Sequence, residues 1–312
     1  MANCDNLFRE FNERIKLSES KKGSLRISRD SLRGKVRDKF KDKDYNVRFC
    51  WQGSFAMNTI ITPKDGDYDV DDGIYIQTDS EPEVSIATLH RWIVEAAEDH
   101  TNQPPSDKNT CVRVHFADGH HIDLVLYYMK ESDEHPQLAH KRDGWIVSDP
   151  KEFMDWFNAQ CDDKGQLKRI VRYFKAWADD LRGDMPSGLI LTILAAESIV
   201  LDDRDDIAFF ETMKGIQDQL NSSFVCYRPT TPDDEDLFAD YSETRKSYFL
   251  DRLSAFAQSG QQALDEVNQK DACPKWKRHF GKRFPCELAE DRLENAKAFD
   301  SPAFIRSDAR SA

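Results

Sequence analysis

The chain of 312 residues carries 44 Lys and Arg against 57 Asp and Glu, a formal net charge of −13, and is 39% hydrophobic. This acidic balance argues against duplex nucleic acid as the main partner, because gripping phosphates needs clustered cations. The longest apolar run, GLILTILAA at 188–196, is too short for a membrane span, and the first residues do not resemble a signal peptide. We therefore expect a globular, cytoplasmic protein without a membrane span.

The first half of the chain mixes helical and strand patterns. Residues 1–43 are expected to be helical, and 46–53 and 68–76 to be strands. Residues 85–98 have helical periodicity, and 110–129 form two alternating runs joined by an Asp-Gly pair, which predicts a hairpin.

The predicted N-terminal helical region is strongly basic between residues 21 and 43. Ten Lys and Arg stand there against three Asp. A stripe at helical spacing, Leu25, Leu32, Val36 and Phe40, is expected to be buried. The basic residues are either a solvated helix face or a surface for phosphate-bearing ligands.

From about residue 150 the pattern becomes helical. Pro150 opens one predicted helix, further helices are expected around 206–220 and 243–269, and 227–240 reads as an acidic loop. The expected fold class is α+β. A lobe with a mixed sheet would cover residues 1–149, a helical lobe would cover 150–312, and a cleft would separate them.

Seven cysteines lie scattered at positions 4, 50, 111, 161, 226, 273 and 286, without a C-x-x-C pair. This arrangement predicts free thiols in a reducing compartment rather than a disulfide framework or a zinc site. His120 and His121 lack a third ligand at zinc spacing, so we interpret them as ordinary strand residues.

Three carboxylates stand where strands are predicted. Asp69 and Asp71 alternate along one strand, so they point to the same face about 7 Å apart. Asp123 lies inside the apolar second strand of the hairpin and needs a partner there. Such carboxylates suit two Mg²⁺ ions, because hard cations take oxygen ligands. The alternative is that Asp69 and Asp71 cap a surface strand and Asp123 pairs with a basic residue.

The neighbouring Asp72 is expected to mark a bulge or the exposed end of that strand. Val70, Ile74 and Ile76 alternate with the Asp69–Asp71 face and should point into the core. Under this interpretation Asp72 has a structural role.

A Gly-Ser pair precedes the carboxylates. Gly53 ends a predicted strand and permits a close backbone approach, and Ser54 can begin a helix whose N-terminus holds phosphate oxygens. A phosphate-cradling turn, a D-x-D pair some 15 residues later and a third acid on a hairpin strand are the pattern of polymerase-beta-type nucleotidyltransferases.

The segments WQGSFAMNT and DYDVDDGIYI resemble the Q-G-S-F and D-x-D-D-G-x-Y motifs of the bacterial cGAS/DncV-like nucleotidyltransferase (CD-NTase) family. The likeness is nearest to the family's DncV-type cyclic GMP-AMP synthases. It continues through TCVRVHFADGHHIDLVLY, DGWIVSDPKEFMDWFN, LKRIVRYFKAW and PSGLIL, and more weakly through KWKRHFGKRF. The resemblance implies a polymerase-beta-like lobe, a helical lobe and an active site between them.

The resemblance also implies roles for individual residues. Asp69, Asp71 and Asp123 would be catalytic and would bind two Mg²⁺ ions, for which Mn²⁺ can substitute. The donor triphosphate would be held by Gln52, Gly53, Ser54, Lys175 and Ser187. The nucleobase and acceptor pocket would be lined by Arg113, Ser148 and Asp149, and Asp233 would approach a base edge.

Some of these residues have other interpretations. Lys175 could be the polar side of an amphipathic helix, and Ser187 is a natural helix N-cap, which is compatible with a nucleotide contact. Met57 stands where DncV-type relatives carry an aromatic residue that can stack on a base, so the base preference is open.

The implied activity is that of a Mg²⁺-dependent nucleotidyltransferase in antiphage signalling. It would condense and cyclise nucleoside triphosphates such as ATP and GTP, release pyrophosphate, and take the acceptor proton on Asp123. A purine cyclic dinucleotide such as cyclic GMP-AMP is the expected product, read by a downstream effector protein. The alternatives are a cyclic trinucleotide synthase, nucleotidyl transfer to RNA or protein, and an inactive nucleotide-binding sensor.

Overall fold

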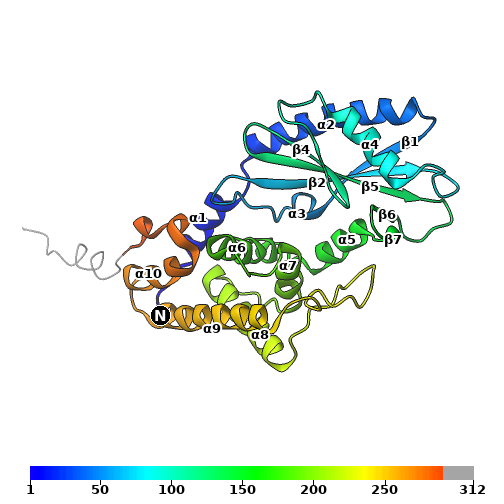
Figure 1. Ribbon diagram of the computed structural model, residues 1–312. Helices are drawn as coiled ribbons and strands as arrows, with labels where there is room; N and C mark the ends of the chain where they lie inside the picture. The colour runs from blue at the N-terminus through cyan, green and yellow to red at the C-terminus, as the bar shows by residue number, and fades with distance from the viewer. Residues whose placement is uncertain (291–312) are drawn as a thin grey trace, which may run out of the picture.

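The structure is a computed structural model and describes residues 1–290. Figure 1 shows a lobe built around a sheet above a lobe built of helices. The elements of the sheet lobe are α2 (Glu19–Lys41), β1 (Asn46–Trp51), α3 (Gly53–Ala56), β2 (Tyr68–Gln77), α4 (Ile86–Ala97), β3 (Ser106–Asp107), β4 (Cys111–His115), β5 (His120–Met129), β6 (Gln137–His140) and β7 (Gly144–Val147). The remaining elements are α1 (Asp5–Ile15), α5 (Pro150–Gln160), α6 (Gln166–Leu181), α7 (Gly188–Glu197), α8 (Asp205–Ser222), α9 (Glu243–Asp265), α10 (Gln269–Phe280), η1 (Gly281–Arg283) and η2 (Cys286–Leu288).

The sheet is mixed, as predicted, and its strand order is β1-β2-β5-β4-β3. The central pair β2 and β5 is parallel, whereas the other pairs are antiparallel. Beyond the end of β4, β5 pairs with β6, which continues into β7. The α+β class predicted from the sequence is therefore confirmed.

Helices α2 and α4 cover one face of this sheet (Figure 1). The stripe Leu25, Leu32, Val36 and Phe40 of α2 is fully buried, as its spacing predicted. The Ser18 side chain accepts a hydrogen bond from the backbone N–H of Lys21, which starts α2 as a helix separate from α1. The opposite face of the sheet is left for α3 and the cleft.

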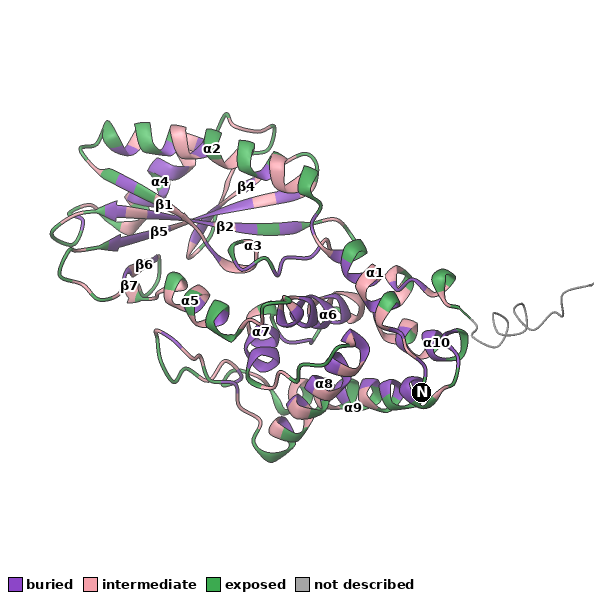
Figure 2. Ribbon diagram, turned by 180° about the vertical axis from the view of Figure 1, so that it is seen from behind, coloured by how far each residue is buried: buried purple, intermediate pink, exposed green. Residues whose placement is uncertain are grey.

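The helical lobe has a continuous core rich in aromatic rings. Figure 2 shows α6 and α7 mostly buried. Phe8 of α1 lies in this core, with its ring centroid 5.0 Å from Trp276 and 5.3 Å from Tyr173. The N-terminal helix α1 thus packs with the helical lobe, and we place it in that lobe. The predicted boundary between the lobes at residues 149 and 150 stays a proposal.

Asp72 differs from its prediction. The register of β2 is continuous through it, without a bulge, and its side chain is fully buried. Alternation along the strand puts Asp72 on the same face as Val70 and Ile74, and α2 covers that face. Arg33 of α2 donates two hydrogen bonds to the Asp72 carboxylate, so the buried charge has a partner.

The prediction that all cysteines are free is wrong for one pair. Cys273 of α10 and Cys286 of η2 form a disulfide, with their Cα atoms 5.6 Å apart. Their sequence spacing of 13 carries no signal for this bond; the turn formed by η1 brings them together. The other five cysteines are free. Within residues 1–290, none of the helices combines the length and the apolar character that crossing a membrane requires.

Candidate active site

The predicted carboxylates meet on the open face of the sheet, where β2 and β5 run side by side. Asp71 is the register partner of Asp123, and Asp69 is the partner of His121. Paired residues on parallel strands point to the same face, as do residues two apart on one strand. The structure therefore brings Asp69, Asp71 and Asp123 onto one face, as the sequence predicted.

Arg113 of β4 joins two of these carboxylates. Its Nε and Nη2 donate to the two oxygens of Asp123 at 2.7 Å each, and Nη2 also lies 2.7 Å from Asp69 Oδ2. This is the strong, bidentate geometry of an arginine–carboxylate pair. The place at the nucleobase and acceptor pocket that the resemblance implies for Arg113 stays a prediction; in the structure Arg113 joins Asp69 and Asp123.

Asp71 has no such partner. Its side chain makes no hydrogen bond or ion pair within residues 1–290. Burial, with a smaller contribution from the charges of Asp123 and Asp69, raises the pKa of Asp71 to about 6. Ionisation of Asp71 is thus disfavoured by burial. A bound cation would favour the ionised form, so Asp71 is a suitable metal ligand.

The donor set is suited to a hard divalent cation, because all three carboxylates offer oxygen atoms. In addition, ligand atoms of Asp67, Asp69 and His121 lie within 4.8 Å of one another at the start of β2. The residues present thus fit a divalent metal; the number and identity of the ions belong to the proposal below.

The Gly-Ser turn packs directly against Asp71. Gly53 has φ +60°, and a Cβ on it would lie 2.3 Å from Asp71 Oδ2, so only glycine fits here. The backbone N–H of Gln52 donates to the Asp71 carbonyl at 3.1 Å. Short helix α3 begins at this turn, and the first turn of a helix leaves N–H groups without intrahelical acceptors. Ser54 lines the cleft at this point.

Gln52 lines the cleft beside this turn. Its side chain is buried, donates to the Tyr75 hydroxyl at 2.7 Å and accepts from the Tyr127 hydroxyl at 3.4 Å. The two tyrosine rings stack with centroids 4.9 Å apart. The side chain is thus already held by two tyrosines, which makes Gln52 a residue that positions the turn.

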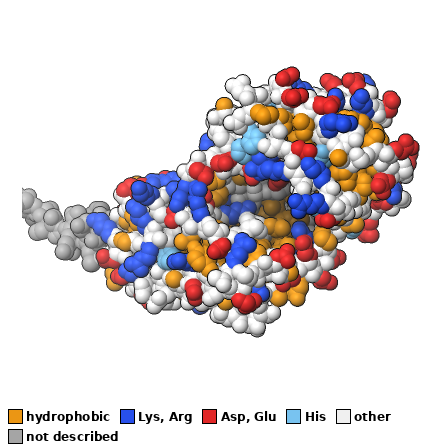
Figure 3. Space-filling view, viewed as in Figure 1, with side chains coloured by type: hydrophobic (Ala, Val, Ile, Leu, Met, Phe, Trp, Pro, Cys, Tyr) orange, Lys and Arg blue, Asp and Glu red, His pale blue; other side chains and the backbone are white. Residues whose placement is uncertain are grey.

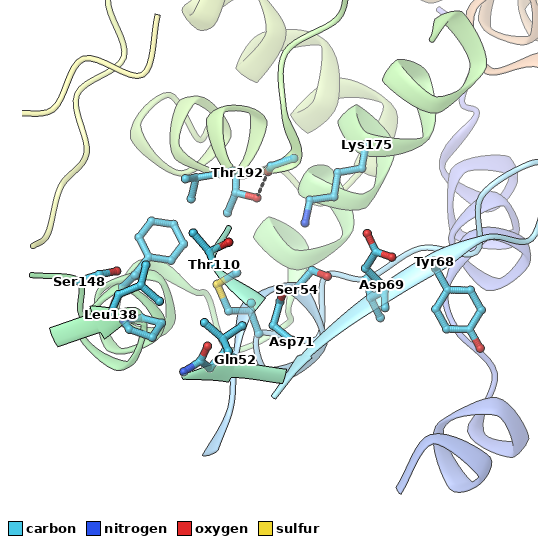
Figure 4. Close-up of a pocket in the computed structure, with 18 of the residues that line it drawn as sticks. Gln52, Ser54, Tyr68, Asp69, Asp71, Thr110, Leu138, Ser148, Lys175 and Thr192 are labelled. Atoms are coloured by element: carbon cyan, nitrogen blue, oxygen red, sulfur yellow. Dashed lines mark hydrogen bonds between the residues drawn. The ribbon is translucent and has the colours of Figure 1, made fainter. Parts of the chain in front are cut away.

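The helical lobe contributes a lysine from the other side of the cleft. Figure 4 shows Lys175 of α6 pointing toward Ser54 and Asp69. Its Nζ donates to Thr59 Oγ1 at 3.1 Å and lies 3.4 Å from the Thr59 carbonyl oxygen. Burial, together with the nearby charge of Arg172, lowers the pKa of Lys175 to about 7. Lys175 therefore belongs to the cleft and not to a solvated helix face.

Ser187 accepts a hydrogen bond from the Ile190 N–H and caps α7, as its sequence context predicted. It does not itself line the cleft, but its neighbours Gly188 and Leu189 do. The cap therefore fixes the end of α7 that faces Lys175.

The cleft between the lobes has a volume of about 720 Å³. Figure 3 shows the molecule hollowed between the lobes. Beyond the Gly-Ser turn its wall becomes apolar and includes Met57, Leu138 and Phe153. Ser148 and Asp149 also line the cleft, and their predicted role at the nucleobase and acceptor pocket stays a prediction. Asp149 in addition caps α5 through the N–H groups of residues 151 and 152.

Sequence reasoning missed several residues of this wall. Thr110, Arg228 and Thr231 line the cleft but lie in loops, where no periodic pattern marks them. Arg228 is held by Glu235, with Nε 2.6 Å from Oε2. Asp233, which the resemblance placed near a base edge, is exposed and does not line the cleft.

Comparison with known families identifies the two lobes. Residues 47–127 match the nucleotidyltransferase domain of DncV-like cyclic GMP-AMP synthases, and 164–290 match the C-terminal domain of cyclic GMP-AMP synthase. Together the matches cover well over half of the chain. This chain belongs to the DncV-like nucleotidyltransferase family.

Individual members are similar over most of the DncV-like chain. It is 30% identical over 274 residues to the cyclic GMP-AMP synthase of Escherichia albertii, which covers 76% of this chain and 60% of that protein. It is 26% identical over 307 residues to the cyclic GMP-AMP synthase of Vibrio cholerae, which covers 76% of this chain and 67% of that protein. The match thus spans less than two thirds of the E. albertii protein.

The fold of the DncV-like chain is that of solved DncV structures. Vibrio cholerae DncV in complex with the linear intermediate 5′ pppA(3′,5′)pG superposes with a TM-score of 0.77 at 24% identity, covering 93% of this chain and all of that one. The same enzyme in complex with nonhydrolysable GTP gives a TM-score of 0.78 at 23% identity. At this level of identity the likeness concerns the fold.

Proposed function

We propose that this chain is a metal-dependent nucleotidyltransferase that condenses and cyclises nucleoside triphosphates into a cyclic oligonucleotide. The single observation that supports this most is the arrangement across the cleft. Asp69, Asp71 and Asp123 share one sheet face beside the Gly-Ser turn, and Lys175 points toward them from the opposite lobe. Phosphoryl transfer depends on such positioning and on stabilisation of charge.

The donor triphosphate would lie between the two lobes. The N–H groups at the start of α3 and the Ser54 hydroxyl would bind its oxygens from the sheet side, and the Lys175 ammonium would bind them from the helical side. The base would then occupy the apolar end of the cleft near Met57 and Phe153. Met57 offers a flexible apolar surface there instead of a ring.

Two Mg²⁺ ions, or Mn²⁺ in their place, are proposed as the cofactor, with Asp69, Asp71 and Asp123 as ligands. When bound, they would supply activation of the acceptor hydroxyl and neutralisation of the leaving pyrophosphate. Arg113 fixes the positions of Asp69 and Asp123 before any ion arrives.

The acceptor ribose oxygen would form a bond to the donor α-phosphorus, and the bond from that phosphorus to pyrophosphate would break. The hydroxyl proton would pass to a carboxylate of the cluster. We keep Asp123 as its acceptor, since each of its oxygens has a second lone pair beside the one that Arg113 uses. The linear product would rebind for a second transfer that closes the ring.

We propose cyclic GMP-AMP as the product, because the chain is similar to enzymes of that name. ATP and GTP would be the substrates, and a downstream effector protein in antiphage signalling in the cytoplasm would read the product. The experiment is to incubate the purified chain with each set of labelled nucleoside triphosphates and Mg²⁺ or Mn²⁺, treat with phosphatase and resolve the products. We expect a phosphatase-resistant dinucleotide only when ATP and GTP are both present.

Two results would contradict the proposal. One is the absence of any phosphatase-resistant product with all four nucleotides and either metal. The other is undiminished synthesis by a variant that carries Asp69→Asn and Asp71→Asn together. A resistant product of three nucleotides would instead correct the product while leaving the reaction type in place.

A further inference from the structure

A basic groove of about 590 Å³ lies outside the cleft, between α1 and the start of α6. Five cations line it: Arg9, Lys164, Lys168, Arg169 and Arg172. Figure 3 shows Lys and Arg side chains gathered in the region where α1 meets the helical lobe. In a protein with a net charge of −13 this local excess of positive charge is unusual.

Arg172 is the most informative of these residues. It is 7% exposed, and its guanidinium donates only to neutral acceptors: the Asn12 side chain at 2.8 Å and the Asn58 carbonyl. Among residues 1–290 no carboxylate lies within 4.0 Å of it. Its neighbour Arg169, by contrast, forms an ion pair with the buried Asp205 at 2.6 Å. Burial disfavours the charge of Arg172, and the nearest carboxylates, Glu13 and Asp205, act on it only from beyond ion-pair distance. Its guanidinium is therefore able to accept an anionic partner.

Lys168 lies one turn before Arg172 on the same face of α6. It makes no hydrogen bond or ion pair within the described part of the chain, and it is partly buried in the groove. The two carboxylates that line the groove, Glu10 and Glu13, are paired with Arg14 and Lys16, which lie outside it. Arg9, Lys164 and Arg169 form ion pairs with Asp5, Asp203 and Asp205. Among residues 1–290, Lys168 and Arg172 are therefore the groove cations without an ion pair.

The groove and the cleft share a wall. The carbonyl of Asn58 accepts from Arg172 on the groove side, while the next residue, Thr59, binds Lys175 on the cleft side. The N–H of Thr59 in turn donates to the Ser54 carbonyl at 2.8 Å. An anion bound to Arg172 would thus lie next to the segment that carries the Gly-Ser turn.

We propose that this groove is a second binding site, separate from the cleft, for a small ligand that carries a phosphate chain. Its volume is in the range of small-ligand pockets, which excludes a nucleic acid duplex as occupant. The planar guanidinium of Arg172 can bind two phosphate oxygens at once, and Lys168 supplies a compact point charge one turn away. Free oligophosphate and the phosphate chain of a nucleotide share this chemistry.

The test is calorimetric titration of the full chain with inorganic tripolyphosphate in the presence of EDTA. A Lys175→Met background removes the cleft lysine that is proposed to bind the triphosphate, which weakens binding in the cleft relative to the groove. Lys168→Glu reverses the charge of one groove side chain, which makes no hydrogen bond or ion pair within residues 1–290. Lys168→Gln only removes that charge and is a milder second variant. Lys43→Glu makes the same change of net charge at an exposed position in the other lobe and serves as the control.

We expect one tripolyphosphate to bind to the Lys175→Met background and to its Lys43→Glu derivative with equal affinity. Lys168→Glu should weaken this binding at least tenfold, and Lys168→Gln by a smaller factor. No binding in the background, or equal affinity of the Lys168→Glu and Lys43→Glu variants, overturns the proposal. ATP as a second probe separates the sources: tighter binding than tripolyphosphate indicates a nucleotide, and equal affinity indicates the phosphate chain alone. Because the readout is binding without metal, it is independent of the proposed synthase activity.

Discussion

Gly53→Ala tests the contact on which the candidate active site depends. The added Cβ would lie 2.3 Å from Asp71 Oδ2, whereas real Cβ contacts are not shorter than 3.0 Å. Asp71 would therefore have to move by about 0.7 Å, the difference between these distances. Misplacing a reacting group by about 1 Å can cost on the order of 100-fold in rate. We expect the variant to lose roughly that factor in product formation.

Gly66→Ala is the matched control for this change. Gly66 also has a positive φ, of +78°, but nothing lies within 4 Å of a Cβ built on it. Both variants should lose about 1–2 kcal/mol of stability from backbone strain, as measured by denaturant unfolding, but only Gly53→Ala should lose activity. If the two variants retain equal rates of product formation, the inferred role of the Gly53–Asp71 contact is wrong.

Three further predictions follow from individual contacts. Because the pKa of Lys175 is lowered to about 7, the lysine loses its charge as the pH rises above that value. The affinity for a nonhydrolysable triphosphate, measured by calorimetry, should then fall up to about tenfold per pH unit, and Lys175→Arg should remove this dependence. Arg33→Ala leaves the buried Asp72 without its partner and should lower the free energy of unfolding by about 3–5 kcal/mol, measured with denaturant. If the stability lost is smaller than that of an exposed ion pair, the assigned burial of Asp72 is wrong. Removing the Cys273–Cys286 disulfide by Cys273→Ser should lower the free energy of unfolding by about 3 kcal/mol, the loop-closure value for a loop of similar length. Addition of reductant should lower the unfolding midpoint of the unmodified chain but not that of the variant.

Much of the sheet lobe could be predicted because its signals are local. Alternation along a strand places Asp69 and Asp71 on one face, and this does not depend on contacts with the rest of the chain. The Asp-Gly pair marked the hairpin that carries Asp123, and the spacing of Leu25 to Phe40 marked the buried side of α2. In each case the information is local: a period of 2 or 3.6 residues, or a turn dipeptide.

The failures have a common cause. Asp72 was expected to mark a bulge or the exposed end of the strand because it breaks the alternation. Only the packing of α2 against β2 supplies Arg33, which allows the carboxylate to be buried. That Arg113 is the basic partner of Asp123 could not be predicted either, because their register is a property of the assembled sheet. The strands β6 and β7 were not predicted, since at four residues each their patterns are too short to read.

The sequence by itself determined the elements, the face of the strand that carries the D-x-D pair, and the motifs by which the family could be suspected. These properties depend on residues close together in the chain. The tertiary structure alone decided which charges are paired and how Lys175 meets the Gly-Ser turn. It also decided that Cys273 reaches Cys286 and that Arg172 donates to neutral acceptors beside a basic groove. Pairing and burial of charge depend on distances between segments that can lie more than 200 residues apart, as Arg14 and Glu287 do, and only the folded chain sets those distances.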